Sequence, residues 1–211
     1  MSQGLRLLLG KISLFTSGGL EHLIDQIFAA DQRVEDTHIP LAILATRIPS
    51  GIPELFRSGS MKSALLASTA IPGAFAPVKI AGISYVDGSV NTAVPLMPAL
   101  QMGAQSLVVF DAGPPCGADT DSPSSLGRLL SDVVAMGTRQ RIATNLPRVA
   151  KEHRVVYIAA PCDLQASAFD FSRTRKRIED GRTAALNLLA AGWSDGVGLI
   201  GKPHFHDTID G

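Results

Sequence analysis

Two short segments that alternate apolar and polar side chains limit most strongly what this chain can fold into. They are Val78–Ile80 and Ile83–Val86, and Gly82 lies in the two-residue gap between them. Such a pair is typical of a β-hairpin, because a two-residue turn that contains glycine reverses the chain between antiparallel strands. The pattern predicts that the second strand ends at Asp87.

Asp87 is followed by Gly88, and this pair allows two interpretations. A carboxylate at the end of a strand in an α/β sheet lies where such sheets place their binding sites, and the glycine lets another segment approach closely. An Asp-Gly pair is also a common turn sequence with a purely structural role. The pair alone does not decide between a site and a turn.

The rest of the chain alternates apolar runs with helical patterns. The runs that predict buried strands are Ile39–Thr46, Ser106–Phe110 and Arg154–Ala160. The helical patterns are Leu20–Phe28, Met61–Ser68, Leu96–Met102, Leu126–Val149 and Ser172–Ala191. We expect Pro147 to end or kink the fourth helix, because proline lacks the donor N–H. The alternation predicts an α/β fold with a mostly parallel sheet and helices on both faces.

We expect one domain over residues 1–195 and a tail over residues 196–211, which have no strong periodicity. The segment Ala112–Ser125 is rich in Gly, Pro, Asp and Ser and is predicted to be a loop.

Apolar residues of Leu5–Phe15 fall on one helical face. This pattern favours a helix whose apolar face packs against the core. The alternative is a helix whose apolar face contacts a membrane surface.

Composition argues against several classes of protein. The chain has 19 Lys and Arg and 19 Asp and Glu, so its net charge is zero and we expect no nucleic-acid partner. Cys116 and Cys162 lack the spacing of a zinc site or a redox motif, and we expect no metal and no cofactor. No apolar run reaches about 20 residues, which predicts no transmembrane helix. We expect a cytoplasmic protein with peripheral contact to membranes.

The residues around Asp87 carry a resemblance to a known family. They are Ala67–Pro72, Phe75–Pro77, Tyr85–Gly88, Pro95, Ala99 and Gly103–Ala104. Together they resemble the patatin-like phospholipases, and the resemblance is specific over about residues 39–111. It implies a three-layer αβα fold and the hydrolysis of a lipid or another acyl ester. It also implies that Asp87, in the motif Asp87-Gly88-Ser89, is the base of a Ser-Asp catalytic dyad.

The chain departs from the family pattern at two places. Ser89 stands where the family has Gly or Ala. The Gly-rich oxyanion loop and the G-x-S-x-G nucleophile motif of the family are both missing before Asp87. The chain therefore looks like an N-terminally truncated patatin domain that starts after its own nucleophile, and a separate N-terminal half is one expected partner.

The missing segment leads to an expectation about association. The strand that precedes the family's nucleophile lies inside its sheet, so we expect Ile39–Thr46 to lack a neighbour. Unpaired strand edges are sticky. We therefore expect the isolated chain to self-associate through that edge.

Three functions stay open from the sequence. The first is a patatin-type serine lipid acyl hydrolase of which this chain carries only Asp87, so that it is inactive alone. The second is a non-catalytic lipid-binding or interaction module. The third is an unrelated hydrolase that uses Ser194.

The third function depends on the G-x-S-x-G match at residues 192–196. A nucleophile motif needs a strand before the serine and a helix after it, whereas here a helix precedes Ser194. His204 and His206 follow as a candidate base or metal pair, but two histidines are too few ligands without others supplied by the fold. Ser194 is therefore the less favoured nucleophile.

Overall fold

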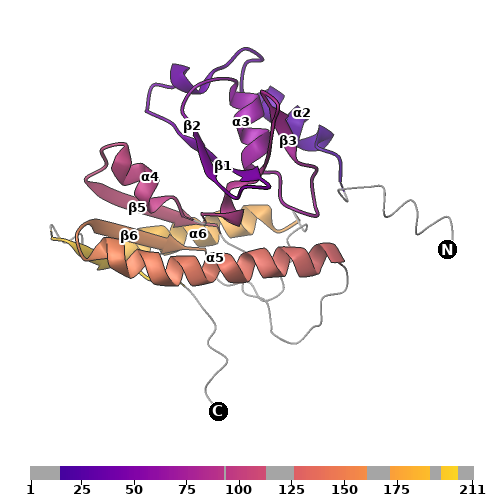
Figure 1. Cartoon of the computed structure of the whole chain (residues 1–211). Coiled ribbons are helices and arrows are strands. Elements are labelled where there is room, and N and C mark those ends of the chain that lie inside the picture. Colours follow the sequence, from indigo (N-terminus) through magenta and orange to yellow (C-terminus); the bar gives the residue numbers. More distant parts are fainter. Residues whose placement is uncertain (1–14, 93, 113–125, 161–171, 191–195, 204–211) are drawn as a thin grey trace. The chain divides into compact units, whose positions relative to one another are not determined.

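The computed structural model describes residues 15–92, 94–112, 126–160, 172–190 and 196–203, and these residues form two compact units (Figure 1). Unit 1 comprises Met1–Ala93 and Pro123–Thr138. Unit 2 comprises Val94–Ser122 and Arg139–Gly211. Each unit is described by itself below.

Unit 1 is built on a four-stranded antiparallel sheet. Its elements are α2 (Gly18–Ile27), the 3-10 helix η1 (Val34–Asp36), β1 (Ile43–Ile48), β2 (Pro53–Phe56), α3 (Met61–Ser68), β3 (Val78–Ile80), β4 (Ile83–Asp87) and the 3-10 helix η2 (Gly88–Val90). The strand order is β2-β1-β4-β3, with every neighbour antiparallel. The prediction of a mostly parallel sheet is therefore wrong for this unit.

The predicted hairpin is confirmed as β3 and β4. Ile80 pairs with Ile83 across the turn. Ala81 and Gly82 have φ angles of 49° and 83°, the positive values that a tight hairpin turn of this hand requires. The turn fixes the register of β4 and therefore the position of Asp87 at its end.

The strand predicted at Ile39–Thr46 is shifted towards the C-terminus and has neighbours on both sides. It runs from Ile43 to Ile48 between β2 and β4, so the expected unpaired edge is not present at this strand. Ile39 is 80 % exposed and lies before the strand. A continuous apolar run indicates a strand that is buried on both faces. A central antiparallel strand can be buried in this way as well as a parallel strand, so the run does not reveal the direction of the strand.

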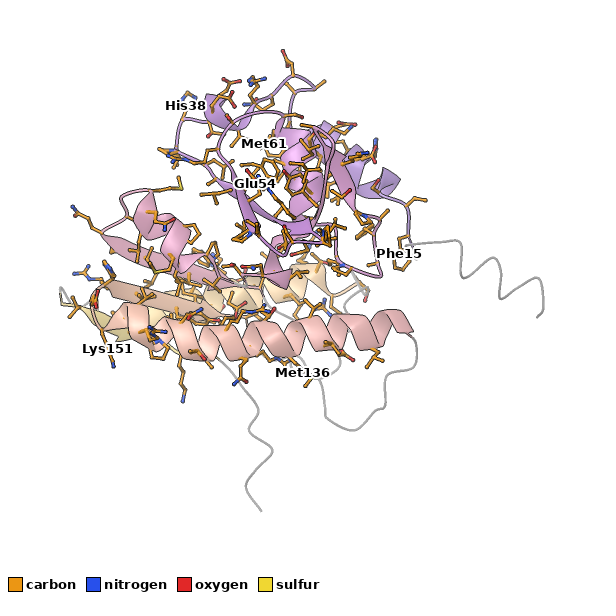
Figure 2. The ribbon with its side chains drawn as sticks, in the orientation of Figure 1. Phe15, His38, Glu54, Met61, Met136 and Lys151 are labelled. Carbon is orange, nitrogen blue, oxygen red and sulfur yellow. The ribbon has the colours of Figure 1, made fainter. Side chains whose placement is uncertain are left out.

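Helix α3 covers one face of this sheet, and its predicted bounds are confirmed (Figure 1). Ser60 caps its first turn by accepting a hydrogen bond from the Ser63 N–H, at 3.3 Å. Met61 is 1 % exposed and packs in one core cluster with Val34 and Ile43 (Figure 2).

A second core cluster of unit 1 lies further along the same face. It joins Ala67 of α3 to Ala45 and Tyr85 of the sheet, and Phe56 packs against it. The rings of Phe56 and Tyr85 meet edge to face, with centroids 5.2 Å apart. This packing holds β1, β2 and β4 together next to Asp87.

Unit 2 contains a three-stranded sheet, and its strands are parallel, as predicted for the sheet of this chain. Its elements are α4 (Leu96–Gln101), β5 (Ser106–Asp111), the part of α5 (Leu126–Ala150) from Arg139 onward, β6 (Arg154–Ala159), α6 (Thr174–Ala190) and β7 (Gly198–Ile200). The first part of α5 belongs to unit 1. The strand order is β5-β6-β7. Val155, Val156 and Tyr157 in the middle strand are at most 1 % exposed, so both faces of β6 are buried.

Two details of unit 2 differ from the sequence prediction. Helix α5 continues through Pro147 to Ala150, so the proline does not end it, and the alternative that it kinks the helix stays a prediction. Gly198–Ile200 pairs in parallel with β6, although the sequence assigns this segment to a tail. A three-residue strand is too short to show periodicity, and only its pairing with β6 defines it. The predicted loop at Ala112–Ser125 lies outside the described residues, apart from Ala112.

Candidate functional site

Asp87 is the last residue of β4, as predicted, and its backbone is fixed from two sides. It pairs with Ala45 of β1, and its N–H donates to the carbonyl of Ala70, just after α3, at 3.0 Å. Ala70 is 2 % exposed. The sheet and the end of α3 therefore both determine where the carboxylate of Asp87 lies.

The carboxylate of Asp87 is half-buried and is held at one oxygen. Its Oδ1 accepts a hydrogen bond of 2.7 Å from the backbone N–H of Ser89, so that the side chain caps η2. Among the described residues, Oδ2 has no hydrogen-bond partner. A carboxylate that is oriented at one oxygen and open at the other can accept a proton from an incoming hydroxyl.

Gly88 is required by a close approach of two backbones. A Cβ at this residue would lie 2.5 Å from the carbonyl oxygen of Leu44 and 2.9 Å from its carbonyl carbon. Real Cβ atoms do not approach backbone atoms that closely, so any side chain would push η2 away from β1. The glycine next to Asp87 therefore allows the turn to lie directly on β1.

Ser89, which replaces the family's Gly or Ala, fits the turn without strain. It lies in η2 and does not have a positive φ. Among the described residues, the one non-glycine residue with a positive φ is Ala81. Its contribution to Asp87 is the backbone N–H, which most residue types supply.

Three side chains from distant parts of unit 1 hold the turn after Asp87. Thr46 of β1 is 1 % exposed, and its hydroxyl donates to the Gly88 carbonyl at 3.4 Å. The amide nitrogen of Asn91 donates to the Gly51 carbonyl at 2.7 Å. The Thr138 hydroxyl donates to the Ser89 carbonyl at 3.3 Å. Sequence reasoning missed all three, because 40 or more residues separate each pair and no local pattern signals the contact.

The basic side chain of β1 next to this region is already paired. Arg47 forms an ion pair and hydrogen bonds with Glu54 of β2, which Figure 2 labels, and its Nε lies 2.6 Å from Glu54 Oε2. The hydrogen bond that the guanidinium donates to Glu54 is the main cause that raises the pKa of Arg47 above its usual value. Arg47 therefore stays charged and stabilises the β1–β2 hairpin.

A second carboxylate at a strand end, Asp111, is held in a different way. The hydroxyl of Tyr157 donates to its Oδ2, and Tyr157 is 1 % exposed. Burial is the main cause that raises the pKa of Tyr157 above its usual value, and the hydrogen bond to Asp111 adds to it. Tyr157 is thus a neutral donor that fixes Asp111 in unit 2, a pair that sequence reasoning did not identify.

Neither a serine partner of Asp87 nor a metal-binding cluster is found in the part of the chain that the structure describes. No serine hydroxyl among the described residues donates to the Asp87 carboxylate, and these residues contain no cluster of three or more His, Cys, Asp or Glu that could hold a metal ion. Ser194, His204 and His206 lie outside the described residues, as do Cys116 and Cys162. No helix within the described ranges is long and apolar enough to span a bilayer.

Comparison with known proteins confirms the predicted resemblance. Residues 1–100 match the family model of the patatin-like phospholipases, a range that includes Asp87, Gly88 and Asn91. Uncharacterized NTE family proteins of Mycobacterium bovis and Mycobacterium tuberculosis are 29 % identical to the chain over 109 residues. That alignment covers 49 % of this chain and 30 % of each relative. The family-model match over residues 1–100 ends before β5, so it falls almost entirely on unit 1.

Proposed function

We propose that this chain is part of a patatin-type serine lipid acyl hydrolase in which Asp87 is the general base of a Ser-Asp dyad. One observation carries the proposal: Ser89 N–H orients the carboxylate of Asp87 at Oδ1, and Oδ2 has no partner among the described residues. The family match over residues 1–100 includes this turn and supports the same role.

The proposed reaction needs a serine that the sequence does not supply before Asp87. Asp87 accepts the hydroxyl proton while the serine oxygen attacks the ester carbonyl, and backbone N–H groups stabilise the oxyanion. The alcohol leaves with that proton, and water then hydrolyses the acyl-enzyme. No G-x-S-x-G motif precedes Asp87 in the 211 residues. We propose that the serine is supplied either by an upstream segment of the same protein or by a separate N-terminal half.

The chain alone is proposed to be inactive. Nucleophile and base act as a unit, and loss of the nucleophile from such a unit costs about a million-fold in rate. The substrate is a lipid or another acyl ester, which implies transient contact of a cytoplasmic protein with a membrane surface.

The test joins the chain to its upstream coding sequence and measures hydrolysis of a chromogenic ester and of phospholipid vesicles. We expect ester hydrolysis by the longer protein, and we expect Asp87→Asn to lower it strongly. Asp31→Asn is the matched control, because Asp31 is exposed and in the same unit. Full activity of Asp87→Asn would contradict the role of Asp87.

A fluorophosphonate serine probe tests the third function that the sequence left open. The 211-residue chain is expected to stay unlabelled, because it lacks the nucleophile. Stoichiometric labelling at Ser194 would favour the unrelated hydrolase and would count against the dyad.

A non-catalytic lipid-binding module is the second candidate, and one observation favours it. β1 has neighbours on both sides, so the sheet of unit 1 does not need a further strand there. Sedimentation of the 211-residue chain with phospholipid vesicles, with no hydrolysis in the longer protein, would support this candidate over the enzyme.

A further inference from the structure

We propose that Asn91 is a positioning residue that sets the orientation of the Asp87 carboxylate by tying η2 to the turn between β1 and β2. The side-chain amide of Asn91 donates to the Gly51 carbonyl at 2.7 Å, across 40 residues of sequence. This inference rests on the proposed function, since it explains how the base of that reaction is held.

The amide of Asn91 is engaged at both ends. While its nitrogen donates to Gly51, its Oδ1 accepts a hydrogen bond of 2.7 Å from the Thr92 hydroxyl. A hydroxyl donates to the amide oxygen and a carbonyl accepts from the amide nitrogen, so both contacts require the same orientation of the amide. Both polar ends of the Asn91 amide are therefore used within the chain.

The anchor at Gly51 is a well-defined turn. The Gly51 N–H donates to the Arg47 carbonyl at 2.8 Å, and the Arg47 N–H donates to the Ile52 carbonyl at 2.9 Å. Gly51 has a φ of 71°, which suits glycine. The Gly51 carbonyl thus has a fixed direction, and Asn91 gains a rigid partner.

The 3-10 helix that Asn91 ties down is short and needs such support. η2 has only the three residues Gly88–Val90, and 3-10 hydrogen bonds have poorer geometry than those of an α-helix. Asn91 also closes the turn through its backbone, because its N–H donates to the Gly88 carbonyl at 3.2 Å.

The link from Asn91 to the carboxylate runs through the Ser89 N–H. That N–H belongs to η2 and is the donor that orients Asp87 Oδ1. The beginning of the turn is held by Thr46 and by the contact of Gly88 with Leu44, whereas the tie to Gly51 holds its end. Without that tie, η2 can rotate and take the Ser89 N–H away from Asp87.

The first test uses the 211-residue chain and needs no activity. Asn91→Leu keeps the branched arrangement of heavy atoms, removes the amide and adds no charge that would act on Asp87 directly. We expect amide hydrogen exchange at Ser89 and Thr92 to become about 5- to 10-fold faster, as the loss of one hydrogen bond allows. Asn145→Leu, the same change at an exposed residue of α5, is the control.

The second test uses the longer protein with its serine. For Asn91→Leu we expect kcat to fall about 10- to 100-fold, the effect of a small misplacement of a reacting group, with KM nearly unchanged. A general loss of fold would speed up amide exchange throughout the chain. The effect expected for Asn91→Leu is confined to η2. Thr92→Val keeps the amide but removes its orienting partner, and we expect a smaller change in the same direction.

The outcomes separate this inference from the proposed function. If the longer protein has no esterase activity, the proposed function fails, and the exchange at Ser89 still decides whether Asn91 holds the turn. Unchanged exchange in Asn91→Leu, or unchanged kcat in an active protein, overturns the inference. If Asn91→Leu does not fold, Thr92→Val decides, and wild-type values of exchange and kcat in that variant overturn it.

Discussion

The two units use similar apolar strands in opposite ways. β1 in unit 1 and β6 in unit 2 are both buried on two faces, yet β1 has antiparallel neighbours and β6 has parallel ones. In unit 1, tight turns join β1 to β2 and β3 to β4. In unit 2, β5 and β6 are connected by α5, and α6 lies between β6 and β7. A tight turn forces its two strands to be antiparallel, whereas parallel strands need a longer crossover such as a helix. The longer connection between β1 and β4 also joins antiparallel strands, so a long connection by itself does not fix the direction.

The units also hold a strand-end carboxylate by different means. In unit 1, Asp87 is oriented by a backbone N–H of the following turn. In unit 2, Asp111 is oriented by the hydroxyl of a buried tyrosine. A carboxylate fixed by backbone tolerates changes of side chain around it, whereas one fixed by a side chain does not. This difference is what the predictions below test.

The largest expected effect separates the two carboxylates by function. Asp87→Asn in the longer protein should lower kcat for ester hydrolysis by about 10²- to 10⁴-fold, the usual contribution of a general base. Asp111→Asn should leave kcat close to that of the unchanged protein. Steady-state kinetics of both variants check this, and equal losses would end the functional distinction between the units.

A smaller effect is expected from the close backbone approach in unit 1. Gly88→Ala places a methyl group 2.5 Å from the Leu44 carbonyl oxygen and should lower the free energy of unfolding by about 1–3 kcal/mol. Gly19→Ala has no atom within 4 Å of the added carbon and should not destabilise. Urea denaturation compares the two, and equal midpoints would contradict the close packing of η2 on β1.

The hydroxyl that holds Asp111 should give a pH-dependent effect. The pKa of Tyr157 is raised in the folded chain, so its stabilising contribution is complete below the unfolded value of about 10 and is lost as pH rises above it. Tyr157→Phe should lower the free energy of unfolding by about 1–3 kcal/mol near neutral pH, since the bond is to a carboxylate. Above about pH 10, the free energy of unfolding should also fall less steeply with pH in the variant than in the unchanged protein. Denaturation at several pH values checks both, and an unchanged slope in the variant would count against the role of Tyr157.

The smallest effect is expected where the backbone supplies the donor. Ser89→Ala keeps the N–H that orients Asp87 and should change the free energy of unfolding by less than about 0.5 kcal/mol. The esterase kinetics of the longer protein should stay at the level of the unchanged protein. A loss in kcat as large as that of Asp87→Asn would mean that the Ser89 hydroxyl takes part in the reaction.

The candidate site could be predicted from sequence only in part. The turn at Gly82 and the alternation of β4 are local, so they are enough to predict Asp87 at a strand end. The helical pattern of Met61–Ser68 is local as well, and it predicts the bounds of α3. The environment of the carboxylate did not follow, because it depends on residues that are distant in sequence.

The sequence by itself determined the local elements, the position of Asp87 and the resemblance to a family. Tertiary structure alone decided that β1 runs antiparallel to its neighbours, that Gly88 lies on the backbone of Leu44, and that Asn91 reaches Gly51. The physical reason is the range of the forces: a turn or a helix cap is set by residues a few positions apart. A hydrogen bond across 40 residues forms only after the sheet has packed and brought both partners together.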